Sequence, residues 1–332
     1  MTSKTRYFVL TAFGILALGL TTGLVASLAG LPVAFSRAAG PDDLSYVPAQ
    51  AVAVAYANVQ EVMASELRQR LRRLEPDTAD RDDFEAKTGV NIERDIDTVV
   101  AAMLSGAQAG TGDSRPLVVA RGRFDQVRIE GLAREHGAAI EDYQGVRMIA
   151  HTGDGDKQTM ALGFIEPGAL ALGSAEAVRG AIDAKRSGRN VLSNTELMRL
   201  VGDLNASNAW VVGRFDAMAG KAGLPDELQR RVPALSWFSA AGHLNGGITG
   251  TFKAEAKDDE AATNLRDMLR GVVAMAKLQA GDKPGMKAIV DSLQLGGEGK
   301  VVAVGFSVPA EMFDALEAMK PRVKGQRPAD LR

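Results

Sequence analysis

The chain has 332 residues, of which 46% are hydrophobic and 24% charged, as in a folded protein with a substantial core. Its formal net charge is -2 and only 5% of its residues are aromatic, so neither a positive field nor stacking side chains favour nucleic-acid binding. It has no cysteine, which excludes disulfides, thiolate metal sites, cysteine nucleophiles and a cysteine-linked lipid anchor.

Residues 1–37 predict a short cytoplasmic stub and a membrane segment. Lys4 and Arg6 precede the uncharged residues 7–35. A secretory signal has about 7–15 apolar residues, whereas a spanning helix needs about 20, so the stretch favours an uncleaved signal anchor. The alternative is a cleaved signal peptide with a small-x-small site at Ser36–Ala38, and a secreted product. By the positive-inside rule the anchor lies in the bacterial cytoplasmic membrane, with the N-terminus in and the body in the periplasm or outside.

The membrane segment also carries a stripe of small residues. Gly19 and Gly23 form a GxxxG pattern, and Ser27 extends it. Such a face lets two helices approach closely and predicts a homodimer through this segment. The alternative is that small residues are simply frequent in membrane helices.

The first half of the exported part begins after a tether, residues 38–50, and covers residues 51–193. In chain order we expect strands at 51–57, 97–104, 116–124, 138–143, 146–151, 159–165 and 169–173, with helices capped by Asn58, Asn91, Asp125 and Ser174.

The second half covers residues 194–319. We expect a bridging helix capped by Asn194, strands at 209–215, 234–244, 246–256, 286–295 and 300–308, a long helix capped by Asp258 or Asp259, and a last helix from Pro309. Residues 320–332 form a basic tail that we expect to be flexible. Because both halves share an order of elements, the sequence predicts an α+β fold of two tandem related units, each an antiparallel sheet with helices packed on one face, preceded by one N-terminal transmembrane helix.

The tetrapeptide Gly-Arg-Phe-Asp occurs twice, at Gly122–Asp125 and at Gly213–Asp216. Two such copies suggest either paired functional sites or a recurring strand-to-helix junction in which the aspartate caps the helix. The copies fall at different places in the element order of the two halves. This favours the structural interpretation.

Two groups of side chains are candidates for ligand binding. His151, Asp154 and Asp156 lie within one short segment and could hold a cation, although Asp154-Gly155 is also typical of a hairpin turn. Trp237 and His243 share one face of a predicted strand, where they form either a binding face or, for the tryptophan, part of the core.

The segment "EAKTGVNIERDID" at residues 85–97 resembles one that recurs in uncharacterised bacterial families of membrane-anchored or exported proteins, where it precedes a β-strand. The resemblance implies no activity and no catalytic residue.

The sequence predicts no cofactor, no metal and no catalytic residue, since it has no HExxH, GxSxG, SxxK or P-loop motif. We therefore expect a membrane-anchored, extracytoplasmic binding or scaffolding protein of the cell envelope, whose partner is an envelope protein or lipid. The alternative is a hydrolase-like enzyme whose site is assembled from distant residues around His151 or His243.

Overall fold

The computed structural model describes residues 41–69, 85, 89–105, 114–135, 137–152, 159–204, 207–218, 234–280 and 284–309. The predicted membrane segment with Gly19, Gly23 and Ser27, the basic tail, and nearly all of the helix expected from Pro309 lie outside these ranges. Within them, no helix is long and apolar enough to cross a membrane.

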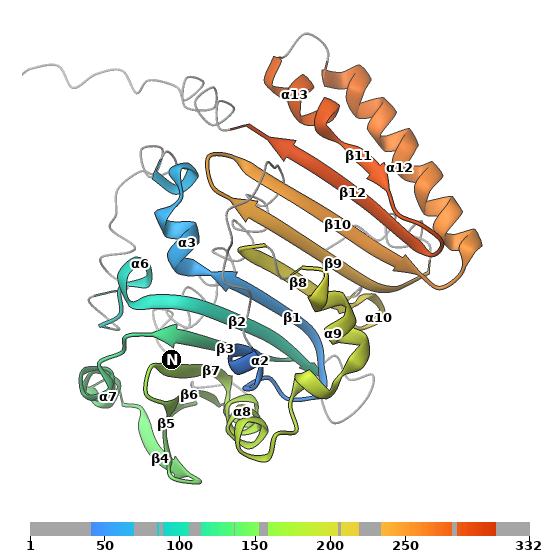
Figure 1. Ribbon diagram of the computed structural model, residues 1–332. Coiled ribbons are helices and arrows are strands. Elements are labelled where there is room, and N and C mark those ends of the chain that lie inside the picture. Colours follow the sequence, from blue (N-terminus) through green and yellow to red (C-terminus); the bar gives the residue numbers. More distant parts are fainter. Residues whose placement is uncertain are drawn as a thin grey trace, which may run out of the picture.

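All strands of these ranges belong to one antiparallel sheet (Figure 1). They are β1 (Ala51–Asn58), β2 (Ile96–Ser105), β3 (Ser114–Gly122), β4 (Ala139–Tyr143), β5 (Val146–His151), β6 (Met160–Glu166), β7 (Ala169–Ser174), β8 (Ala209–Arg214), β9 (Leu235–Leu244), β10 (Ile248–Ala256), β11 (Gln294–Gly296) and β12 (Val301–Val308). Their order across the sheet is β11-β12-β10-β9-β8-β1-β2-β3-β7-β6-β5-β4.

The helices are α2 (Pro41–Leu44), α3 (Val59–Ala64), α6 (Ile92–Asp95), α7 (Gln126–Glu135), α8 (Ala175–Ser187), α9 (Thr195–Gly202), α10 (Phe215–Met218), α12 (Asp259–Ala280) and α13 (Pro284–Ser292), with a 3-10 turn η1 (Val191–Ser193). An α+β fold with a large antiparallel sheet is therefore confirmed.

The two halves meet at the centre of the sheet, where β1 pairs with β8 and Val54 lies opposite Val212. Outward from this pair the strands run β2, β3, β7, β6 on one side and β9, β10, β12, β11 on the other; β5 and β4 extend the first side. The expectation of a separate sheet for each half is wrong. Pairing β1 with β8 removes two edges that separate sheets would leave unpaired.

Helices cover both faces of the sheet, so the expectation of helices on one face is also wrong. One face packs against α8 and α9 and holds Val54, Tyr56, Val100, Leu117, Val178, Ile182, Leu197 and Trp210 in a single cluster. On the opposite face, Val99 and Val118 pack against Val59 of α3, and α12 covers Ala254 and Val302 farther along. Both faces of β2 and β3 pack against other parts of the chain, so these strands are apolar almost without the alternation of a strand with one exposed face.

Most local predictions are confirmed by the hydrogen bonds at the helix starts. Side chains cap as expected at Asn58, Asn91, Asp125, Ser174, Asn194 and Asp258. The β4–β5 turn has positive φ at both Gln144 and Gly145, as a type I′ hairpin requires.

Two segments differ from expectation. Residues 286–295 were expected to be a strand, but α13 occupies most of them and only β11 is extended. Its apolar residues satisfy a helix equally well, and short apolar runs do not separate the two structures. From Pro41 on, the expected tether is folded: Leu44, Tyr46 and Val47 are buried in the main core.

Candidate functional site

The predicted His151 cluster is only partly within the described ranges. His151 ends β5 and lies opposite Met160 of β6. Asp154 and Asp156 lie outside the described residues. Within the described ranges no group of three histidine, cysteine, aspartate or glutamate side chains is placed to hold a metal ion.

Trp237 and His243 share one face of β9, as expected, but they differ in environment. Trp237 is 7% exposed and belongs to the main core, as in the packing interpretation. His243 is partly exposed and lies opposite Thr249 of β10. The His243 side chain forms no hydrogen bond or ion pair with another described residue. Six strands separate β9 from β5, so His243 and His151 lie roughly 30 Å apart across the sheet.

A charged network around Tyr46 was not foreseen from the sequence. The Tyr46 hydroxyl donates to Glu166 and accepts from Arg121 at 3.0 Å, and Lys185 lies 4.6 Å from the centroid of its ring. Arg121 also lies 3.6 Å from Asp43. Burial and the hydrogen bond to Glu166 raise the pKa of Tyr46, although the charge of Arg121 acts in the opposite direction. The network links the segment around Asp43 and Tyr46 to β3, β6 and α8.

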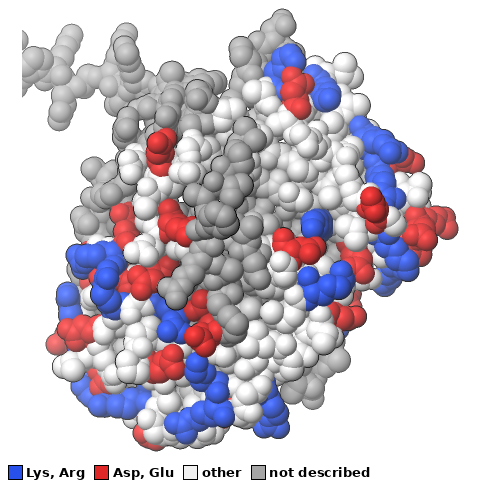
Figure 2. Space-filling view, in the orientation of Figure 1, with Lys and Arg blue, Asp and Glu red and all other residues white. Residues whose placement is uncertain are grey.

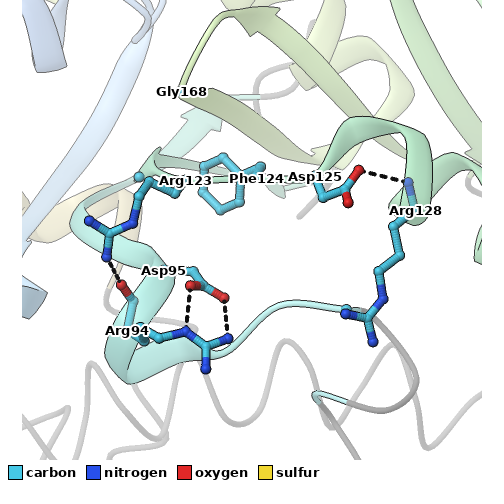
Figure 3. A pocket seen from close by; sticks show the side chains of 9 residues that line it. Arg94, Asp95, Arg123, Phe124, Asp125, Arg128 and Gly168 are labelled. Atoms are coloured by element: carbon cyan, nitrogen blue, oxygen red, sulfur yellow. Dashed lines mark hydrogen bonds and ion pairs between the residues drawn. The ribbon is translucent and has the colours of Figure 1, made fainter.

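A shallow depression of about 550 Å³ lies where β2 begins and β3 ends, beside the first Gly-Arg-Phe-Asp copy (Figure 3). It is lined by Gly89, Arg94, Asp95, Gly122, Arg123, Phe124, Asp125, Arg128 and Gly168. These residues come from the loop before α6, the α6–β2 junction, the β3–α7 junction and the β6–β7 turn. Chain segments that are distant in sequence therefore build it.

The floor of the depression consists of closely packed backbone. The N–H of Gly122 donates to the carbonyl of Gly168 at 2.9 Å, and the N–H of Arg123 donates to the carbonyl of Asp95 at 2.7 Å. A Cβ at Gly122 would lie 1.9 Å from that Asp95 oxygen, so only glycine fits. The floor is therefore fixed by main-chain contacts, independently of the side chains that surround it.

Three arginines with exposed side chains surround this floor. Arg94 pairs with Asp95 at 3.0 Å and with Glu85 at 3.3 Å. The guanidinium of Arg123 donates to the carbonyl of Arg94, and that of Arg128 lies beside Gly89. Within the described ranges neither Arg123 nor Arg128 forms an ion pair. Figure 3 shows these two guanidinium groups on opposite sides of the depression, with Asp95 between them in this view.

The two aspartates of the depression are already engaged in structural hydrogen bonds. Asp125 caps α7 by accepting from the N–H of Arg128 at 3.0 Å. Asp95 accepts from the N–H of Asn91 at 2.9 Å. Burial would raise the pKa of Asp95, but hydrogen bonds from Arg94 and Asn91, with the charges of Arg94 and Arg123, outweigh it and lower the pKa.

The second Gly-Arg-Phe-Asp copy has different surroundings. It lies on the central strand β8, and Arg214 forms two hydrogen bonds with Asp216, at 3.1 and 2.5 Å. α10 begins at Phe215, so Asp216 is its second residue and not the residue before the helix, and the expectation that Asp216 caps this helix is wrong. The prediction that the two copies are not equivalent is confirmed, because β3 lies two strands from the β1–β8 centre. Two stretches singled out in the sequence contribute to the depression: the first tetrapeptide, and the segment at residues 85–97, which supplies Gly89, Arg94 and Asp95.

No family model matches the chain, and no curated protein matches it. One solved structure is similar. It is a crystal form of TP0453, with 12% identity and a TM-score of 0.45, and the match covers 84% of this chain and 98% of that one.

Proposed function

We propose that this chain is a non-catalytic binding or scaffolding protein of the bacterial cell envelope. Residues 7–35 anchor it in the cytoplasmic membrane, and the folded part lies outside the cytoplasm. The support for this location is the charge pattern of the sequence, with Lys4 and Arg6 before a long uncharged stretch. The partner is another envelope component, and a second copy of the chain binds through Gly19, Gly23 and Ser27.

We further propose that the folded part arose by duplication of one α+β unit. The support is the strand order, which is the same outward from β1 and outward from β8 apart from the added β4–β5 hairpin. The antiparallel β1–β8 pair gives such units an approximate two-fold relation. A duplicated sheet with covered faces supplies a rigid platform, and binding residues are then placed at its ends.

The observation that carries the binding function is the open depression beside α7. A shallow surface rimmed by exposed charged side chains suits contact with a larger partner better than enclosure of a small substrate, because substrate pockets bury most of their ligand. Arg123 and Arg128 provide hydrogen-bond donors there, and the backbone floor holds their positions without a ligand. Val127, 82% exposed in the first turn of α7, lies in sequence between Asp125 and Arg128, which both line the depression, and is the apolar side chain that we assign to the partner contact.

Photo-crosslinking in the intact cell tests this function. A benzophenone amino acid replaces Val127, and a matched variant carries it at Leu278, an 84% exposed residue near the end of α12. We expect a single crosslinked species from position 127 that position 278 does not give. Absence of an adduct at Val127, or the same adducts from both positions, would contradict binding at the depression.

A further inference from the structure

The depression has a mixed charge pattern. Its lining holds three arginines and two aspartates, so one positive charge is in excess. The aspartates are used in capping and in the pair with Arg94, and both lie on chain segments that also carry an arginine. Figure 2 shows basic and acidic side chains interspersed over the visible face, and so local pairing decides recognition more than a broad field.

Arg123 and Arg128 retain donors that no described residue engages. A guanidinium has five N–H groups, and the bond of the Arg123 side chain to the carbonyl of Arg94 leaves most of them without a partner among the described residues. The guanidinium of Arg128 makes no hydrogen bond to any described residue. Planar guanidinium groups recognise carboxylates through two parallel hydrogen bonds.

We propose that the depression binds an acidic polypeptide segment of a partner protein, with one carboxylate on Arg123 and another on Arg128. This inference rests on the binding function proposed above and names the chemistry of its partner. The two guanidinium groups lie on opposite sides of the depression, so an extended segment that crosses it meets both (Figure 3). Phe124 lies between the two arginines in sequence and lines the depression. Its side chain is partly buried against the core, and the remaining surface offers an apolar contact to the crossing chain.

The charge pattern favours a polypeptide over a uniform polyanion. A polyphosphate chain that crossed from Arg123 to Arg128 would bring negative charge against Asp95 and Asp125, and like charges at such contacts are unfavourable. A polypeptide can place neutral or basic side chains opposite the aspartates and carboxylates opposite the arginines. The N-terminus of α7 adds a favourable dipole for a carboxylate near Arg128.

Fluorescence anisotropy with the full chain in zwitterionic detergent tests the inference. The probe is a labelled peptide of Glu-Ser-Gly repeats, and its matched control is the Gln-Ser-Gly peptide. We expect binding of the first only, weakened by salt because the contacts are exposed. The double variant R123Q/R128Q should bind the glutamate peptide about tenfold more weakly, a loss of about 1.4 kcal/mol. The matched double variant R214Q/R270Q removes two exposed arginines elsewhere, which pair with Asp216 and Asp267, and should bind like wild type.

A charge exchange keeps the test decisive. The variant R123E/R128E should lose the glutamate peptide and gain a Lys-Ser-Gly peptide, which a merely unfolded protein cannot do. The proposal would be overturned if both glutamine variants weakened binding of the glutamate peptide equally. It would also be overturned if polyphosphate displaced the glutamate peptide and bound more tightly than the peptide at the same two arginines. A single adduct at Val127 that persists in R123Q/R128Q would retain the binding function and reject the acidic partner.

Discussion

Removal of the Tyr46 hydroxyl isolates the contribution of the network that fastens residues 41–50 to the sheet. Tyr46 is fully buried, and Tyr46→Phe leaves an oxygen of Glu166 and a guanidinium N–H of Arg121 without their partner. A hydrogen bond to a charged group contributes about 1.5–3 kcal/mol. The side chains of Glu166 and Arg121 are 33% and 35% exposed, so water replaces part of the loss. We therefore expect destabilisation of about 1–2 kcal/mol.

The matched control is Tyr143→Phe. The Tyr143 hydroxyl also bonds a carboxylate, that of Asp183, at 3.1 Å, but this tyrosine is only partly buried. Its loss should cost about 0.5 kcal/mol. Urea unfolding of the full chain in detergent, followed by fluorescence, measures both variants because Trp210 and Trp237 are buried in the same core as Tyr46. Equal shifts of the two midpoints would refute the reasoning.

Tyr46→Phe should also change how the stability of the protein depends on alkaline pH. Since the pKa of Tyr46 is raised on folding, the neutral phenol stabilises the protein fully below the ordinary tyrosine pKa of about 10. That stabilisation is lost as the pH rises through the raised value. Wild type should therefore lose stability above about pH 10 more steeply than Tyr46→Phe. Parallel curves would contradict the assignment.

Three further outcomes follow from the fold. Gly122→Ala should lower the free energy of unfolding by about 2 kcal/mol or more because its Cβ meets the Asp95 carbonyl. Gly271→Ala, whose Cβ has no atom within 4 Å in helix α12, should raise it by about 0.5–1 kcal/mol. Thermal unfolding compares the two variants. Asp95→Asn should be destabilising near neutral pH and progressively less so as the pH falls below the ordinary aspartate pKa of about 3.9, since the lowered pKa of the folded carboxyl gives stability that is lost as the pH falls through it; urea midpoints over a series of acidic pH values check this. A reporter that folds only outside the cytoplasm, fused after Arg332, should be active, and cytoplasmic activity of its counterpart would refute the topology.

Local structure was predictable because its causes are local. Asn58, Asp125, Ser174 and Asn194 each satisfy free N–H groups within a few residues, so the side chain and the helix start are read from one short segment. The hairpin at Gln144-Gly145 follows equally from two residues. α13 was missed because its apolar residues fit either period.

The parts that escaped prediction depend on residues distant in sequence. Glu166 contacts Tyr46 across 120 positions, and neither residue has a neighbour that signals the other. The depression also depends on residues distant in sequence. Arg94, Arg123 and Gly168 meet only because the start of β2, the end of β3 and the β6–β7 turn lie at the same edge of the sheet. The pairing of β1 with β8 likewise has no sequence signature, since both strands read as ordinary apolar runs.

The central pair also sets an order of events for the growing chain. β1 is complete at Asn58, but its partner β8 begins only at Ala209. At about 5–20 residues per second, synthesis separates them by roughly eight to thirty seconds. Through that interval the edge of β1 that pairs with β8 stays open, even once β2 has paired with the other edge, and it is a template for pairing with another nascent chain. The β1–β8 pairing that unites the two halves in one sheet is thus also the folding step most vulnerable to aggregation. A chaperone that shields β1 until β8 is synthesised would act at this strand.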